Sequence, residues 1–219
     1  MENEMYSEEY RGCTIRIYLD DIHENPITEW DMLGTFVCFH SRYDLSNTDY
    51  FKDADFLREF LDENDVIWLP LYLYEHGGIS ISTEAFSCPW DSGQIGVVYV
   101  EHDRVLKEYG VNGDKVVTEQ MRQRAIDCLQ SEVKTFDQYL RGEVYGYQTE
   151  DSDGENIDSC WGYYGDYANE LYGDDYILGE ARGSIDYHLE QEKKTHFEQL
   201  KIWIKNRVPL HRRYPCPVI

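Results

Sequence analysis

Residues 66–102 read VIWLPLYLYEHGGISISTEAFSCPWDSGQIGVVYVEH, and the expected fold is built around them. This stretch holds three apolar runs, VIWLPLYLYEH, ISIST and IGVVYVEH, whose length and composition predict β-strands. Gly77-Gly78 turns the chain after the first run, and AFSCPWDSGQ supplies turn geometry before the third. We therefore expect an antiparallel arrangement. Pro70 has no N–H to donate, which predicts an edge position or a bulge in the first strand.

Three helices are expected around these strands. Residues 51–63 place apolar side chains on one face and carboxylates on the other. Apolar residues spaced three and four apart predict a second helix over about 118–140, which Gly142 is well placed to end. A last helix is expected from about Gly179 or Ser184 to Asn206. The residues expected on its buried face are Ile185, Leu189, Phe197, Leu200 and Ile204.

Further strands lie on both sides of this region. CTIRIYLD from Cys13 alternates and GTFVCFH from Gly34 is apolar, so both predict strands. EVYGYQTE and IDSCWGYYG predict a hairpin joined by the acidic turn 151–155. The fold class is therefore α+β, with a mostly antiparallel or mixed sheet of five to seven strands and two or three packed helices.

The expected domain organisation is simple. Residues 1–11 are expected to be a flexible N-terminus, and 207–219 a C-terminal tail. Residues 12–206 are expected to form a single α+β domain, with 12–110 and 111–206 as possible subdomains. The chain of 219 residues is long enough to bury a substantial core.

Charge is the most informative feature of the composition. With 43 acidic and 20 basic residues the net charge is −23, of which −15 falls in residues 1–100. This excludes a broad nucleic-acid-binding surface and attraction to an anionic membrane, so we expect no direct nucleic-acid partner and no membrane partner. No run of about 18 apolar residues occurs, and MENEMYSEEYRG lacks the features of a signal peptide, so we expect a cytoplasmic protein. Six scattered cysteines predict plain reduced thiols.

The densest cluster of reactive side chains lies in the segment SCPWDSGQ. Cys88 with His76 or His102 would be a nucleophile and its base, with Asp91 as the orienting group. No protease or nucleophile-elbow signature surrounds it, and Pro-Trp-Asp-Ser-Gly also makes a good turn by itself. We favour the turn, with Trp90 packed against the sheet, and keep a small hydrolase or nuclease as the alternative function.

No cofactor or metal site is expected. Asp20, Asp21, His23 and Glu24 supply ligand types for Mg²⁺ or Mn²⁺, but their spacing matches no defined metal loop, so a solvated loop is favoured. The 151–155 turn resembles a calcium loop only superficially, because its glycine comes too early. Neither GxxxxGK[ST] nor GxGxxG occurs. Tyr163 and Tyr164 could stack on bases, but acidic neighbours favour packing in a core or a protein interface.

Three stretches carry a resemblance to a known family: NPITEWDMLGTFVCFHSRYDL, LPLYLYEHGGISISTEAFSCPWDSGQIGVVYV and VYGYQTEDSDGENIDSCWGYYGDY. Together they resemble uncharacterised proteins of bacteriophages, archaeal viruses and mobile elements. The resemblance implies no catalytic residue, because no activity is established for the family. It implies a setting, since small accessory proteins of mobile elements often act on host machinery such as restriction and CRISPR defences.

These observations predict a non-enzymatic inhibitor that binds the basic nucleic-acid channel of a host defence protein, an anti-CRISPR or anti-restriction type. Carboxylates at helical spacing lie about 5–6 Å apart and could imitate phosphates. The alternative is that the charge serves only solubility. The residues expected to bind the partner are Asp55, Glu59, Asp62, Glu63, Asp20, Asp21, Glu24, Trp90 and Asp91.

The C-terminal end departs from this acidic character. Its basic residues are Lys193, Lys194, Lys201, Lys205, Arg207, Arg212 and Arg213. They would either pair with the acidic first half or solvate a helix face, and we expect the second. The tyrosine content would also permit an oligomeric scaffold, and the oligomeric state is left open.

Overall fold

The computed structural model describes residues 3–111, 115–165 and 176–207. These residues divide into two compact units, each described by itself. Unit 1 contains the described chain up to Tyr18, the segment Gly146–Trp161 and the last helix, and unit 2 contains Leu19–Tyr145 and residues 162–165. This division differs from the single domain expected over 12–206 and from a boundary near residue 110.

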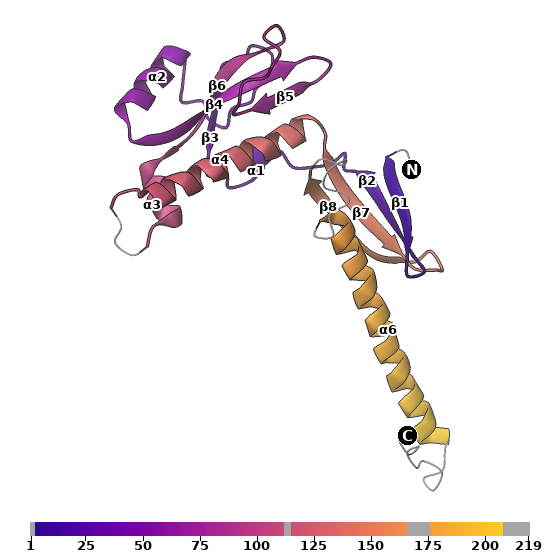
Figure 1. Cartoon of the computed structure of the whole chain (residues 1–219). Coiled ribbons are helices and arrows are strands. Elements are labelled where there is room, and N and C mark those ends of the chain that lie inside the picture. Colours follow the sequence, from indigo (N-terminus) through magenta and orange to yellow (C-terminus); the bar gives the residue numbers. More distant parts are fainter. Residues whose placement is uncertain (1–2, 112–114, 166–175, 208–219) are drawn as a thin grey trace. The chain divides into compact units, whose positions relative to one another are not determined.

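Unit 2 is a four-stranded antiparallel sheet with helices on both faces (Figure 1). The strand order is β3-β6-β4-β5. The elements are α1 (Pro26–Glu29), β3 (Thr35–Cys38), α2 (Ala54–Glu63), β4 (Val66–Glu75), β5 (Ile79–Ser82), β6 (Ser92–Glu101), α3 (His102–Tyr109) and α4 (Glu119–Leu140). The expected strands and the first two expected helices are therefore confirmed.

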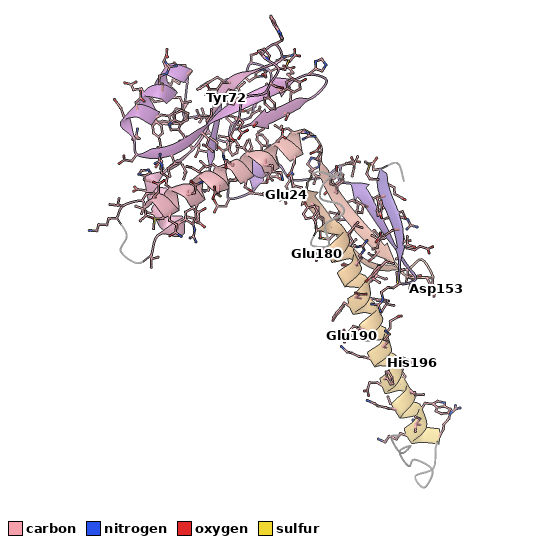
Figure 2. All side chains as sticks on the ribbon, in the orientation of Figure 1. Glu24, Tyr72, Asp153, Glu180, Glu190 and His196 are labelled. Atoms are coloured by element: carbon pink, nitrogen blue, oxygen red, sulfur yellow. The ribbon has the colours of Figure 1, made fainter. Side chains whose placement is uncertain are left out.

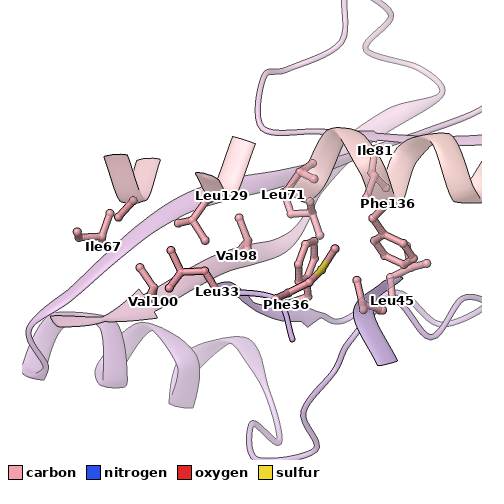
Figure 3. Close-up of a cluster of buried hydrophobic side chains, with 14 of the residues drawn as sticks. Leu33, Phe36, Leu45, Ile67, Leu71, Ile81, Val98, Val100, Leu129 and Phe136 are labelled. Atoms are coloured by element: carbon pink, nitrogen blue, oxygen red, sulfur yellow. The ribbon is translucent and has the colours of Figure 1, made fainter. Parts of the chain in front are cut away.

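The main core of unit 2 lies between the sheet and α4. Leu129 and Phe136 of α4 are buried against Phe36, Leu71 and Val98 of the strands (Figure 3). Burial of one such side chain stabilises a fold by about 1.5–3 kcal/mol. The Thr118 side chain caps α4 by accepting from the N–H of Met121, and the positive φ of Gly142 follows its end, as the sequence predicts.

The opposite face of this sheet is covered only in part. Helix α2 buries Leu57 against Val97 and Tyr99 of β6, with Phe51 completing this second core. β4 alternates across the sheet, so Ile67 and Leu71 face α4 while Trp68 faces the other way and is 45% exposed. A strip of the sheet beside α2 is therefore open.

Pro70 is accommodated because β4 is paired on one side at this point. It lies opposite Val97 of β6, and pairing with β5 begins only at Tyr72. A register irregularity follows between Leu71 and Tyr72. β4 is thus an inner strand whose first half pairs with a neighbour on one side only, as an edge strand does. A proline is tolerated there because its missing N–H is not needed for a second ladder.

Unit 1 is a second four-stranded sheet packed on one long helix (Figure 1). The strand order is β1-β2-β7-β8. The elements are β1 (Glu4–Tyr10), β2 (Cys13–Leu19), β7 (Val144–Glu150), β8 (Asn156–Tyr164) and α6 (Ile177–Arg207). Residues 4–10 form a strand, so the prediction of a flexible N-terminus is wrong for them. The predicted tail, 207–219, lies outside the described residues after Arg207.

Only the first turns of α6 are buried. Ile177, Leu178, Ala181 and Ile185 pack in the core of unit 1, and Leu189 is half-buried. The prediction is wrong for Phe197, Leu200 and Ile204, which are exposed because α6 runs on past its sheet. Glu190 and His196 mark this projecting part in Figure 2.

The α+β fold class is confirmed. The strands form two antiparallel sheets rather than one, and the described residues contain five helices rather than two or three. Two short helices were not predicted. In α1 the sequence signal was present, because the Asn25 side chain caps Ile27 and Pro26 occupies the first helical position.

Candidate functional site

The open strip of the unit 2 sheet forms a groove beside α2. It has a volume of about 580 Å³ and is lined mainly by apolar side chains. Those that shape it are Phe39, Leu57, Leu61, Trp68, Ile95 and Val97, with Arg58 and Asp62 at its polar edge. We call it the anionic groove because of the helix that forms its wall. Exposed aromatic side chains in such a recess are typical anchors of protein interfaces.

The outer face of α2 carries the predicted acidic stripe. Asp55, Glu59, Asp62 and Glu63 are all exposed, as the helical spacing predicts. Residues 52–65 carry six carboxylates and two basic side chains, a net charge of −4. Within the described residues, the stripe has one ion pair, between Asp55 and Arg58 at 3.1 Å, and such an exposed pair adds little stability.

At the C-terminal end of α2, the carboxylates of the stripe interact unfavourably with the helix dipole. At the N-terminus, the Asp53 side chain accepts from the N–H of Phe56 at 2.8 Å, which caps the helix. Asp62 and Glu63 lie in the last turn, where the dipole favours cations, and that turn has no basic residue. Each of these two carboxylates is therefore expected to destabilise α2 by a few tenths of a kcal/mol. Their presence is not explained by the stability of the fold.

A second recess continues from the anionic groove toward the β4–β5 turn. It measures about 650 Å³, shares His40 and Ile95 with the anionic groove, and is lined by Glu75, His76, Trp90 and Asp91. Trp90 is 92% exposed, so the prediction that it packs against the sheet is wrong. Trp90 and Asp91 thus lie in a recess that adjoins the anionic groove.

Cys88, Asp91 and His76 meet at this turn, but not as a catalytic arrangement. Asp91 lies between the other two, with its carboxylate 3.4 Å from His76 Nδ1 and 3.7 Å from Cys88 Sγ. A thiol nucleophile needs the imidazole as its base, and the thiol here donates to the carboxylate. The Ser92 hydroxyl donates to the Cys88 carbonyl and Glu75 N–H donates to the Asp91 carbonyl. These hydrogen bonds are typical of a structural turn.

His102 is not part of this cluster. It starts α3, its N–H donates to the Asp65 carbonyl at 3.0 Å, and it borders a different recess that contains Asn64 and Glu101. The structure therefore selects His76 as the histidine next to Asp91.

Asp20 has a structural role in the loop that follows β2. Asp20 is 9% exposed, and its carboxylate accepts from the N–H groups of Ile22 and Gly162 at 3.0 and 3.1 Å. Glu24 accepts from the Trp30 indole N–H at 2.8 Å, so it also supports the loop. Asp20 is thus buried and used by the loop itself, while Asp21 and Glu24 are exposed, in keeping with the solvated loop that the sequence predicts. The described residues contain no group of three or more side chains suited to a metal ion.

The acidic turn after β7 is a hairpin turn. The Asp151 carboxylate accepts from the N–H groups of Asp153 and Glu155, both at 2.9 Å, and Gly154 takes a positive φ of 81°. These bonds use the carboxylate that a calcium loop would need. Tyr164 packs edge-on against Trp30 with centroids 4.9 Å apart, and burial raises the pKa of Tyr164 to about 12. That tyrosine therefore serves packing.

One polar site was missed by sequence reasoning. Burial raises the pKa of Glu132 on α4, although the N–H groups of Leu33 and Gly34 bond its two oxygens at 2.5 and 2.8 Å. Burial also raises the pKa of the neighbouring Tyr109 to about 12. A buried carboxyl in a recess can be a proton donor, but both oxygens here hold the backbone before β3. Its role is to anchor that loop.

The two aromatic anchors of the anionic groove were also missed. Trp68 lies in an almost continuous apolar run, so alternation between the two sheet faces was hidden. Phe39, 38% exposed, follows β3 in a similar run. Pro70 was the sequence signal that this part of the sheet is open, because a strand that is covered on both sides rarely contains a proline.

Within the described part of the chain, the helices are too short or too polar to span a bilayer. No family model, curated protein or solved structure matches this chain. The likeness to mobile-element proteins seen in the sequence therefore stays a prediction.

Proposed function

We propose that the protein is a non-enzymatic inhibitor that places its anionic groove on the basic, nucleic-acid-binding surface of another protein. The observation that carries the proposal is the pair Asp62 and Glu63, which are exposed in the last turn of α2, where the helix dipole disfavours carboxylates; Asp62 also lies at the edge of a groove with exposed aromatic anchors. Residues that oppose local stability are expected at functional sites.

The chemistry divides between two parts of this surface. The acidic face of α2 attracts a basic partner and accelerates association, since complementary charge raises the rate of encounter. Trp68 and Phe39 then supply apolar area that is removed from water on binding. In keeping with the sequence resemblance, the partner would be a host defence factor in the cytoplasm of the host cell.

The test is capture of partners from a host extract on the tagged protein, washed across a salt series. The proposal predicts a nucleic-acid-binding protein that is retained at low salt, released as salt rises, and displaced by added DNA or RNA. A captured protein that is insensitive to both salt and nucleic acid would contradict it.

The alternative, a small hydrolase or nuclease at Cys88, is less well supported. The three candidate side chains meet, but Asp91 separates the thiol from His76. A Cys88→Ala variant that folds and loses all function would favour the enzyme over the inhibitor.

A further inference from the structure

The strongest unexplained feature outside the proposed site is the projecting end of α6. Five large apolar side chains between residues 197 and 204 are exposed there: Phe197 (61%), Leu200 (41%), Ile202 (58%), Trp203 (51%) and Ile204 (38%). Contiguous exposed apolar area of this kind marks a binding surface. The helix leaves its sheet after the buried Ile185, so its own unit does not cover these side chains (Figure 2).

These apolar residues form an ordered stripe with basic flanks. Phe197, Leu200 and Ile204 are spaced three and four apart and share one side of the helix, with Trp203 beside them. Lys194, Lys201 and Lys205, spaced seven and four apart, follow the edge of that side. We call these seven residues the basic stripe. Residues 193–207 have five basic side chains and one carboxylate, a net charge of +4.

The charge of this helix end acts locally. Residues 193–207 span about 22 Å at the rise of an α-helix. That is more than two Debye lengths at physiological salt, about 8 Å each, so charges beyond the start of this segment, where Lys194 pairs with Glu190 at 2.9 Å, are largely screened from Lys205 and Arg207 at its end. In a chain of net charge −23, the tip of α6 therefore presents a cationic, apolar surface.

The chain itself offers a complementary surface. The anionic groove has an apolar floor, two exposed aromatic side chains, and Arg58 and Asp62 at its edge, while the outer face of its wall carries further acidic side chains of residues 52–65, whose net charge is −4. The basic stripe has apolar side chains and a net charge of +4. An amphipathic helix in an apolar groove with opposite charges at the rim is a common mode of recognition.

We infer that the basic stripe of one copy docks into the anionic groove of a second copy. Two copies that exchange their stripes reciprocally form a closed pair, and a one-way contact would form an open chain. This self-association goes beyond the proposed inhibitor function. It is measured on the purified protein without a partner, so an experiment can rule out the self-association and leave the inhibitor function standing, or the reverse. Where both hold, self-docking competes with the partner for the same groove.

The experiment is sedimentation velocity on the purified full chain across a wide concentration and salt series. The inference predicts association that grows with concentration and weakens about tenfold or more as salt rises. Wild-type protein that stays monomeric throughout would overturn the inference. The basic stripe would then bind an acidic partner other than a second copy of the chain.

Two charge-reversal variants make the test specific. Lys201→Glu with Lys205→Glu brings residues 193–207 from +4 to a net charge of zero, and Glu59→Lys with Asp62→Lys brings residues 52–65 from −4 to zero. Each variant alone then lacks one of the two opposite charges and is expected to be monomeric, while their mixture associates because the unaltered groove of the first variant meets the unaltered helix of the second. A mixture that stays monomeric, or a variant that associates alone, would overturn the inference.

Two controls distinguish an effect of the docking surface on association from effects of net charge and of misfolding. Arg122→Glu with Arg124→Glu lowers the net charge by as much as Lys201→Glu with Lys205→Glu, on exposed positions of α4, and should leave association as in the wild type. Circular dichroism on each variant shows whether the helices are retained. Loss of association in this control would mean that net charge alone governs it, which would contradict the inference.

Discussion

The Glu132 carboxylate on α4 accepts a hydrogen bond from the backbone N–H of Gly34 at 2.8 Å, which ties the entry of β3 to the helix. The same carboxylate accepts from Leu33 N–H. The strand that forms one edge of the unit 2 sheet is thus positioned from α4.

Burial of the Glu132 carboxyl makes the stability of the fold depend on pH, against the opposing effect of these two hydrogen bonds. Burial raises the folded-state pKa of Glu132 above its usual 4.5, so the folded protein holds the proton more tightly than the unfolded chain does. Its stabilising contribution is complete below about pH 4.5 and is lost as pH rises through the raised pKa. The free energy of unfolding of the wild type relative to Glu132→Gln should therefore fall as pH rises from acid to neutral. Urea unfolding of both proteins measures this, and a difference independent of pH would contradict it.

Gly34 itself has no room for a side chain. A Cβ at this position would lie 2.7 Å from Leu129 and from Val98, and 2.8 Å from Glu132. Gly34→Ala should destabilise the protein by about 1–3 kcal/mol, the usual effect of overpacking. Gly93→Ala is the matched control, because a Cβ there meets nothing within 4 Å, and thermal unfolding should place it within about 0.5 kcal/mol of the wild type. Equal effects of the two changes would count against this account of the packing.

Arg182 of α6 holds β1 in unit 1 by a two-point ion pair with Glu8, at 2.9 and 3.1 Å. Arg182 lowers the pKa of Glu8, so this stabilisation is present above the usual value of 4.5 and is lost as pH falls through the lowered pKa. Arg182→Met should destabilise by about 1 kcal/mol at neutral pH, and by less in acid. Denaturant unfolding at both pH values measures it, and an effect that grows in acid would refute the assignment.

Cys88 is expected to be dispensable. Its thiol donates to Asp91 within a turn that is also held by the Ser92 hydroxyl on the Cys88 carbonyl and by Glu75 N–H on the Asp91 carbonyl, so Cys88→Ala should change stability by less than about 0.5 kcal/mol and leave partner capture intact. Capture is compared with that of the wild type at equal salt. Loss of capture in a folded variant would return the enzyme hypothesis to consideration.

The sequence predicted the elements with strong local signals. Helix α4 was placed from its apolar spacing, Thr118 at its start and Gly142 beyond its end, and the acidic stripe of α2 was placed on the exposed face. These features depend on neighbours along the chain, which is why periodicity finds them.

Features set by distant contacts could not be predicted. The separation into two sheets depends on which strands pair, and alternation within β4 was masked by apolar residues on both faces. The exposure of Phe197 and Leu200 depends on where the unit 1 sheet ends under α6, not on the helix itself. Trp68 became part of the candidate site for the same reason, because α2 covers only part of its face of the sheet.

The most direct test of the central claim measures stability and binding together in Asp62→Lys with Glu63→Lys. Cations in the last turn of α2 match the helix dipole, so the variant should be as stable as the wild type or more stable, by about 0.5 kcal/mol per residue. The account predicts that this variant loses salt-sensitive capture of a basic partner while it gains stability. Retained capture at wild-type strength would contradict the account, because the acidic stripe would then not be the binding surface.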